Sequence, residues 1–173
     1  MTRAAAVFAA LLAIACAAPI RTVVTADDLP HGLTKIAIVP LKADYDVPQV
    51  APRLVTARVA ANVESETKLR VVEVTQADAM LSGVVRRYVE RDGSSTGVRH
   101  PASVWIVLEL RDGDGRVLWT GTYEETQAAL SEDAGSLPRA WERGFRWVTA
   151  EDLAAYGVRE LVRELAREVG TWS

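Results

Sequence analysis

The sequence predicts an α+β domain, with a mixed sheet of about five strands, helices packed on the sheet and a helix at the C-terminal end. Two observations support this class. Over residues 104–110, every second residue is a core type and the other face is mixed, and over 116–126 Val117, Trp119 and Tyr123 share one face, which is the period of strands with one buried face. Apolar residues recur at helical spacing after residue 50 and again after residue 149. The predicted order is strand, helix, strand, three-stranded meander, helix.

The first predicted strand is residues 35–40, Lys-Ile-Ala-Ile-Val-Pro. Its residues are apolar on both faces, as in a central strand that is covered on both sides, and Pro40 ends it. A second strand is predicted at residues 69–74, a run rich in β-branched residues.

An amphipathic helix is predicted between these two strands, ending at about Thr67. Asp46 and Gln49 have the spacing of a capping box, with Pro48 early in the first turn. Pro52 conflicts with so early a start, and the regular helix can equally begin there. The apolar stripe at helical intervals consists of Leu54, Val55, Val59 and Val63.

The meander is predicted from three strands: residues 80–90, with Gly83 inside, then 104–110 and 116–126. Residues 91–102 are polar and predict a loop. The Asp-Gly-Asp-Gly sequence of residues 112–115 is typical of a hairpin turn. Core positions are expected at Val104, Ile106, Leu108 and Leu110, and opposite them at Val117, Trp119 and Tyr123.

The last helix is predicted to start at a capping box formed by Thr149 and Asp152, with Val148 and Leu153 as a hydrophobic staple. Its buried stripe is Val158, Leu161, Val162, Leu165 and Val169. Three arginines and three glutamates form adjacent stripes, which favours a solvent face of salt bridges over an anion site: Arg159, Arg163, Arg167, Glu160, Glu164 and Glu168. Residues 127–148 form an excursion, with a short helix predicted at 137–143.

The N-terminus has the pattern of an export signal. Arg3 precedes an unbroken apolar run over residues 4–14, which is shorter than the roughly 20 residues that span a bilayer. Residues 12–16, Leu-Ala-Ile-Ala-Cys, resemble the lipobox of bacterial lipoproteins, and the resemblance implies acylation of Cys16, the only cysteine. The alternative is ordinary cleavage at the A-x-A-like residues 15–17.

These N-terminal features divide the chain into a signal peptide at residues 1–15, a lipidated N-terminus and tether at 16–34, and one domain at 35–173. Ala17 follows the cysteine where an inner-membrane retention signal usually has aspartate. By resemblance, this favours the outer membrane, with the domain facing the periplasm.

The sequence lacks the residue patterns that nucleic-acid binding, metal binding and hydrolysis require. The net charge of −3 offers no global field for nucleic acid. His31 and His100 are the only histidines, and neither has a second ligand at metal spacing. Residues 93–97, Gly-Ser-Ser-Thr-Gly, match the letters of a nucleophile elbow but join two strands, so a loop is favoured over a hydrolase that uses Ser94 or Ser95. Asp112 and Asp114 lack the other ligands of a calcium loop. No enzyme, cofactor or metal is predicted.

One segment contains residue types suited to binding. Between residues 139 and 147, three arginines interleave with three aromatic residues: Arg139, Trp141, Arg143, Phe145, Arg146 and Trp147. Such residues are enriched at interface hot spots and suit phosphorylated lipid headgroups. The alternative is that the aromatic side chains are core residues that cap the sheet.

Several short segments occur in an order that resembles the outer-membrane lipoproteins of lipopolysaccharide assembly. They are residues 35–40, 70–73, 77–83 and 115–119, and the resemblance spans most of the mature domain. The resemblance implies an accessory lipoprotein that binds an outer-membrane β-barrel, lipopolysaccharide or both. Similar patterns occur in lipoproteins of the Tol and curli systems and in activators of penicillin-binding proteins. A peptidoglycan-synthase activator and an auxiliary component of secretion or transport are therefore alternatives, and the short tether argues against the activator.

Overall fold

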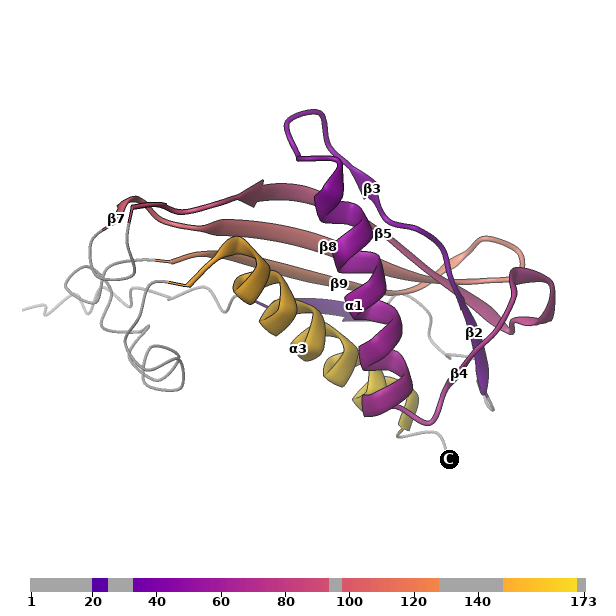
Figure 1. Cartoon of the computed structure of the whole chain (residues 1–173). Helices are drawn as coiled ribbons and strands as arrows, with labels where there is room; N and C mark the ends of the chain where they lie inside the picture. Colours follow the sequence, from indigo (N-terminus) through magenta and orange to yellow (C-terminus); the bar gives the residue numbers. More distant parts are fainter. Residues whose placement is uncertain (1–19, 25–32, 94–97, 128–147, 171–173) are drawn as a thin grey trace, which may run out of the picture.

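The computed structural model describes residues 20–24, 33–93, 98–127 and 148–170. They form a seven-stranded mixed sheet with two long helices on one of its faces (Figure 1). The predicted α+β class, with a C-terminal helix, is confirmed. No helix in these residues is long and apolar enough to cross a bilayer.

The sheet has a parallel half and an antiparallel half. Its strands, in spatial order, are β1 (Ile20–Val24), β9 (Val117–Thr126), β8 (Ser103–Asp112), β5 (Ala79–Val89), β2 (Lys35–Ile38) and β4 (Arg70–Val71), with β3 (Lys42–Ala43) also pairing with β5. The strands β2, β3, β4 and β5 are parallel where they pair, and β5, β8, β9 and β1 form antiparallel pairs. The predicted central strand β2 and the predicted three-stranded meander are both confirmed.

The meander buries the face that the alternation predicts. Val104, Ile106, Leu108 and Leu110 are fully buried, and so are Trp119 and Tyr123 on the neighbouring strand. Val117 is only partly buried, because the register shifts between Leu110 and Arg111 next to the turn.

The predicted hairpin turn is formed at residues 112–115. The Asp112 carboxylate accepts hydrogen bonds from the backbone N–H groups of Asp114 and Arg116, at 3.0 and 2.9 Å. Gly115 has a φ of +82°, a conformation that favours glycine. These contacts account for Asp112 as a turn residue.

Helix α1 (Val50–Glu66) ends close to the predicted residue but does not use the predicted cap. Its N-cap is Gln49, and no side chain caps the helix there. Pro52 falls in the first turn, where its missing N–H has no intrahelical partner to lose. Val55, Val59 and Val63 are buried as predicted, whereas Leu54 is 38% exposed. The predicted capping box and the predicted burial of Leu54 are therefore wrong.

Helix α3 (Ala150–Gly170) begins at the predicted capping box. The Thr149 hydroxyl accepts a hydrogen bond from the backbone N–H of Asp152 at 3.1 Å, and the Asp152 carboxylate accepts one from the N–H of Thr149 at 3.1 Å. The predicted charged face is also present: Arg163 pairs with Glu160 and Arg167 with Glu164. Arg163 reaches Glu66 of α1 as well, at 3.2 Å, and so links the two helices.

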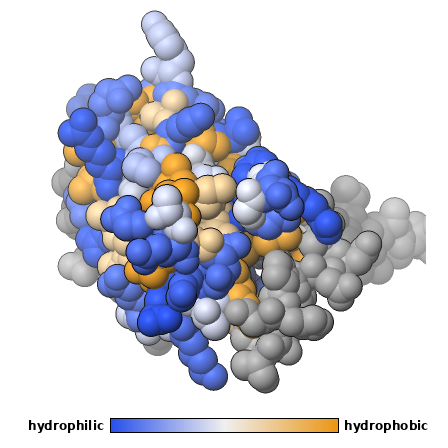
Figure 2. Space-filling view, turned by 90° about the vertical axis from the view of Figure 1, so that its right-hand side faces the viewer, coloured by the Kyte–Doolittle hydropathy of each residue, from blue (hydrophilic) through white to orange (hydrophobic). Residues whose placement is uncertain are grey.

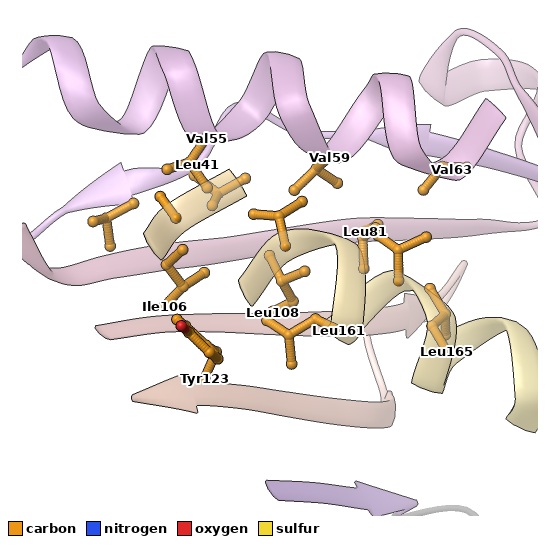
Figure 3. Packing of buried hydrophobic residues seen from close by; sticks show 14 of the residues in the cluster. Leu41, Val55, Val59, Val63, Leu81, Ile106, Leu108, Tyr123, Leu161 and Leu165 are labelled. Carbon is orange, nitrogen blue, oxygen red and sulfur yellow. The ribbon is translucent and has the colours of Figure 1, made fainter. Parts of the chain in front are cut away.

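The core lies between the helices and the covered face of the sheet. Figure 3 shows Val55, Val59 and Val63 of α1 directed toward the sheet, with Leu161 of α3 beside Leu108 and Leu165 further along α3. Two glycines allow this close approach. A Cβ atom on Gly157 of α3 would lie 2.2 Å from the ring of Tyr123, and one on Gly121 would lie 2.2 Å from the ring of Trp119.

Two predictions for the first half of the chain need correction. Residues 20–24, predicted as part of the tether, form β1. All five of these residues pair with β9, which offers a free edge there. The strand predicted at 69–74 is only two residues long, since it meets just the first two residues of β2 and then turns into the short helix η1 (Val74–Gln76).

The predicted loop 91–102 is also partly wrong. It contains the strands β6 (Asp92–Gly93) and β7 (Val98–His100), which pair with each other. Asp92 opposite His100 keeps the register of Val89 opposite Ser103, so this hairpin prolongs the β5–β8 ladder. The ladder is interrupted where Pro101 has no N–H to donate.

Candidate docking surface

The two faces of the sheet differ in what covers them. Both long helices pack on one face, and in the described part of the chain no helix covers the central strands on the other, which we call the open face. Ala37 and Ser103, which the strand registers place on the open face, are buried. Most other side chains on this face are half-buried or exposed. They are Met80, Ser82, Val84, Trp105, Val107, Glu109, Thr120, Thr122, Glu124, Arg21 and Val23.

Trp105 is the largest side chain on the open face, and a β-bulge places two arginines beside it. The register between β5 and β8 shifts between Val85 and Arg87, so Arg86 is an extra residue in β5. The guanidinium carbons of Arg86 and Arg87 lie 5.3 and 5.7 Å from the Trp105 ring centroid. Both distances are in the range of cation–π contacts.

Each of these arginines also has an acidic partner. Arg86 lies 3.7 Å from the Asp44 carboxylate, and Arg87 lies 3.4 Å from Glu124 on β9. Arg87 also donates a hydrogen bond to the hydroxyl of Ser103 at 3.3 Å. The Trp105 cluster is therefore nearly neutral, and its side chains are held in place before any partner binds. Such preorganisation lowers the entropic cost of association.

The loop that carries Asp44 also presents apolar side chains to solvent. Tyr45 is fully exposed, and Val50 and Leu54, which follow on one face of α1, are 55% and 38% exposed. Arg86 links this loop to Trp105 through Asp44. Tyrosine, tryptophan and arginine are the residues most enriched at protein-binding hot spots. We call Trp105, Arg86, Arg87 and Tyr45 together the docking surface.

A groove of about 530 Å³ lies near the β4 edge of the sheet, between β2, β4 and η1. It is lined mainly by Ile38, Val71, Val74 and Gln76, and Glu73 is its single ionisable side chain. Figure 2 shows the end of the molecule where β2 and β4 lie, with apolar and polar residues intermixed. An acid–base pair needs a second titratable group, which this lining does not contain.

The titratable groups with shifted pKa values serve structural contacts. The carboxylate of Asp78 accepts hydrogen bonds from the backbone N–H groups of Thr34 and Lys35, at 3.1 and 2.9 Å, and these bonds lower its pKa. Burial raises the pKa of the Tyr88 hydroxyl, and nearby carboxylates, Glu151 first, raise it further. Within the described ranges, no three His, Cys, Asp or Glu residues are grouped as a metal site.

Most of the site residues predicted from the sequence lie outside the described residues. These are Cys16, His31, Ser94, Ser95 and all six candidates of the arginine and aromatic segment: Arg139, Trp141, Arg143, Phe145, Arg146 and Trp147. The residues that flank that segment are joined, since the backbone N–H of Val148 donates to the side-chain oxygen of Gln127 at 2.8 Å. His100 is an exposed side chain, 3.8 Å from Asp92.

The docking surface is absent from the sequence predictions. Trp105 is visible in the sequence only as a large residue on the less apolar face of an alternating strand. The β-bulge that brings both arginines to it depends on pairing with β8, which no local pattern reveals. Tyr45 has a local signal: an aromatic residue between two aspartates, in a turn-forming segment, is unsuited to burial.

Comparisons with known proteins define the fold. No protein-family model matches the chain, and no curated protein does. PelC from Paraburkholderia phytofirmans, solved as a dodecamer, is 18% identical with a TM-score of 0.59, and the match covers 85% of this chain and 96% of that chain. A point variant of PelC, also a dodecamer, matches with a TM-score of 0.58 and the same identity, over 85% of this chain and 95% of the variant.

Two further structures match less closely. A DUF4136 family protein from Bacteroides thetaiotaomicron is 12% identical with a TM-score of 0.50, covering 84% of this chain and 94% of that chain. Lipoprotein GNA1162 from Neisseria meningitidis is 16% identical with a TM-score of 0.42, covering 65% of this chain and 95% of that chain, and is too distant in structure to support an argument. At such identities these likenesses show a shared fold and no more.

Proposed function

We propose that this chain is a non-enzymatic lipoprotein of the bacterial outer membrane that works by binding protein through the docking surface. The observation that supports this most directly is the pair of arginines in cation–π range of Trp105, on a sheet face without a covering helix in the described part of the chain. The side chains of this cluster are preorganised, nearly neutral in total charge and partly exposed. These properties suit protein binding better than catalysis.

The membrane anchor in this proposal is Cys16. An apolar stretch after Arg3 leads to the lipobox-like residues 12–16, and Ala17 favours the outer membrane. Diacylglycerol on the cysteine sulfur with a further acyl chain contributes about 0.8 kcal/mol per buried CH₂, which is enough for stable attachment. The domain then faces the periplasm.

Further copies of this chain are the partner that we favour. PelC, which shares the fold over most of both chains, is a dodecamer. The docking surface suits a contact between identical chains, because its arginines are already neutralised by Asp44 and Glu124. Two copies would therefore meet without like-charge repulsion. The proposed role is a ring or other closed assembly at the membrane.

The second candidate is an accessory role in lipopolysaccharide assembly, with an outer-membrane β-barrel or lipopolysaccharide as the partner. It is supported by the resemblance of residues 35–40, 70–73, 77–83 and 115–119 to that family. In this role, Arg139, Trp141, Arg143, Phe145, Arg146 and Trp147 are the candidate lipid or barrel contacts. An activator that must reach the cell wall is disfavoured further by β1, which begins four residues after Cys16.

Photo-crosslinking from the docking surface tests the proposal. Benzoylphenylalanine replaces Tyr45, whose full exposure makes the change neutral for stability, and the acylated protein is irradiated in membranes and after purification. We expect crosslinked species at multiples of the chain mass in both samples. The matched control is benzoylphenylalanine at Arg167, an exposed position on α3.

Each pattern of crosslinks leads to one conclusion. A ladder from position 45 that is absent from position 167 supports self-assembly. A single adduct with a β-barrel protein, seen only in membranes, supports the second candidate instead. Equal and weak crosslinking from both positions would show that this surface does not bind protein.

A further inference from the structure

The edge strand β1 exposes apolar and basic side chains. Val23 and Val24 are 59% and 39% exposed, and Arg21 is exposed. In the described part of the chain, β1 pairs only with β9 and no carboxylate pairs with Arg21. An apolar edge strand with free backbone groups promotes unwanted strand pairing unless something covers it.

The tether length limits how far β1 can stand from the membrane. This inference rests on the proposed acylation of Cys16. Four peptide steps join Cys16 to Ile20, the first residue of β1. Fully extended, they span about 14 Å.

That reach excludes two sides of the domain as the membrane-facing side. The far edge, β4, lies five strand spacings from β1, which is about 24 Å. The hairpin turn at residues 112–115 lies beyond Val24 in the strand direction, about 23 Å from Ile20 at ~3.3 Å per residue. Neither side can rest on a bilayer that holds Cys16.

Of the sides within reach, the helical layer and the β1 edge differ in surface chemistry. The helical layer presents ion-paired arginines and glutamates, including Arg163 with Glu160 and Arg58 with Glu151. The β1 edge presents valine side chains and Arg21, which pairs with no carboxylate among the described residues. Valine suits the apolar boundary of the headgroup layer, and the guanidinium group of arginine suits lipid phosphate.

We propose that the β1 edge is the membrane-facing side of the domain, with Val23 and Val24 at the headgroup layer and Arg21 against lipid phosphates. The covering that this edge strand needs is then supplied by the bilayer surface. The docking surface on β5, β8 and the Asp44 loop stays free for protein.

Fluorescence quenching in vesicles tests this orientation. The acylated protein carries a single new cysteine, Val23→Cys, labelled with an environment-sensitive fluorophore, because the sulfur of Cys16 is already consumed by lipid. It is reconstituted into vesicles of phosphatidylethanolamine and phosphatidylglycerol with a nitroxide quencher on the headgroups. We expect quenching several-fold stronger than for the control Ser65→Cys, on the exposed side of α1.

A linker variant makes the result specific to the short tether. Inserting about 20 Gly/Ser residues after Ala18 raises the root-mean-square reach to about 25 Å, and we expect it to abolish the difference between positions 23 and 65. Equal quenching at both positions in protein whose mass includes the acyl chains would overturn the orientation and leave the anchor intact. Absence of acyl mass would overturn the proposed anchor itself. Disulfide dimers of the unlabelled Val23→Cys protein would show that a second copy covers β1, also against the proposal.

Discussion

Leu108→Ala is expected to lower the free energy of unfolding by about 2–5 kcal/mol, the range for truncating a buried leucine. Leu108 is fully buried at the centre of β8, where it faces the helical layer. Its strand neighbours are Gly83 and Gly121, which have no side chains to fill the resulting cavity. Urea unfolding followed by circular dichroism measures the loss.

Val107→Ala is the matched control for this substitution. Val107 is the preceding residue on the same strand, but its side chain lies half-buried on the open face. A half-exposed valine contributes less, so the expected loss is under about 1 kcal/mol. A larger loss at Val107 than at Leu108 would mean that the open face is covered by a core and is no surface for docking.

Gly157→Ala should destabilise the domain by about 1–3 kcal/mol, the cost of overpacking a core. The added Cβ atom would lie 2.2 Å from the Tyr123 ring, and Tyr123 is fully buried with its hydroxyl bonded to Glu125 at 2.6 Å. Helix propensity acts in the opposite direction, because alanine is favoured over glycine inside a helix by about 1 kcal/mol. A lower free energy of unfolding would show that the clash with Tyr123 outweighs the gain in helix propensity.

The background Tyr123→Leu isolates the clash. With the ring removed, Gly157→Ala should become neutral or stabilising, and the double-mutant cycle should give a coupling between the two positions. Destabilisation of the same size in both backgrounds would mean that the Tyr123 ring does not rest on Gly157.

The parts of the fold that follow from local patterns are predicted well from the sequence. The alternation in β8 identifies the four buried residues from Val104 to Leu110. The capping box at Thr149 fixes the start of α3, because the Thr149 and Asp152 side chains satisfy backbone groups within one turn. Each signal is carried by residues that are neighbours in the chain.

The parts that depend on distant contacts are not predicted. The strand β1 forms because β9, about 100 residues later, offers an edge, and the sequence of residues 20–24 has no strong period of its own. The bulge at Arg86 exists only in the pairing with β8. Leu54 is partly exposed because the buried stripe of α1 consists of Ala51, Pro52, Val55, Val59 and Val63, and Leu54 lies to one side of it.

The anchor at Cys16 is the central claim of this account, because the proposed location and orientation both depend on it. The most direct test is the mass of the N-terminal tryptic peptide from the mature protein in membranes. We predict a peptide that spans residues 16–21 and begins at Cys16, with a diacylglyceryl group on the sulfur and no trace of residues 1–15. A peptide that begins at another residue, or a Cys16 peptide without acyl chains, would contradict the account.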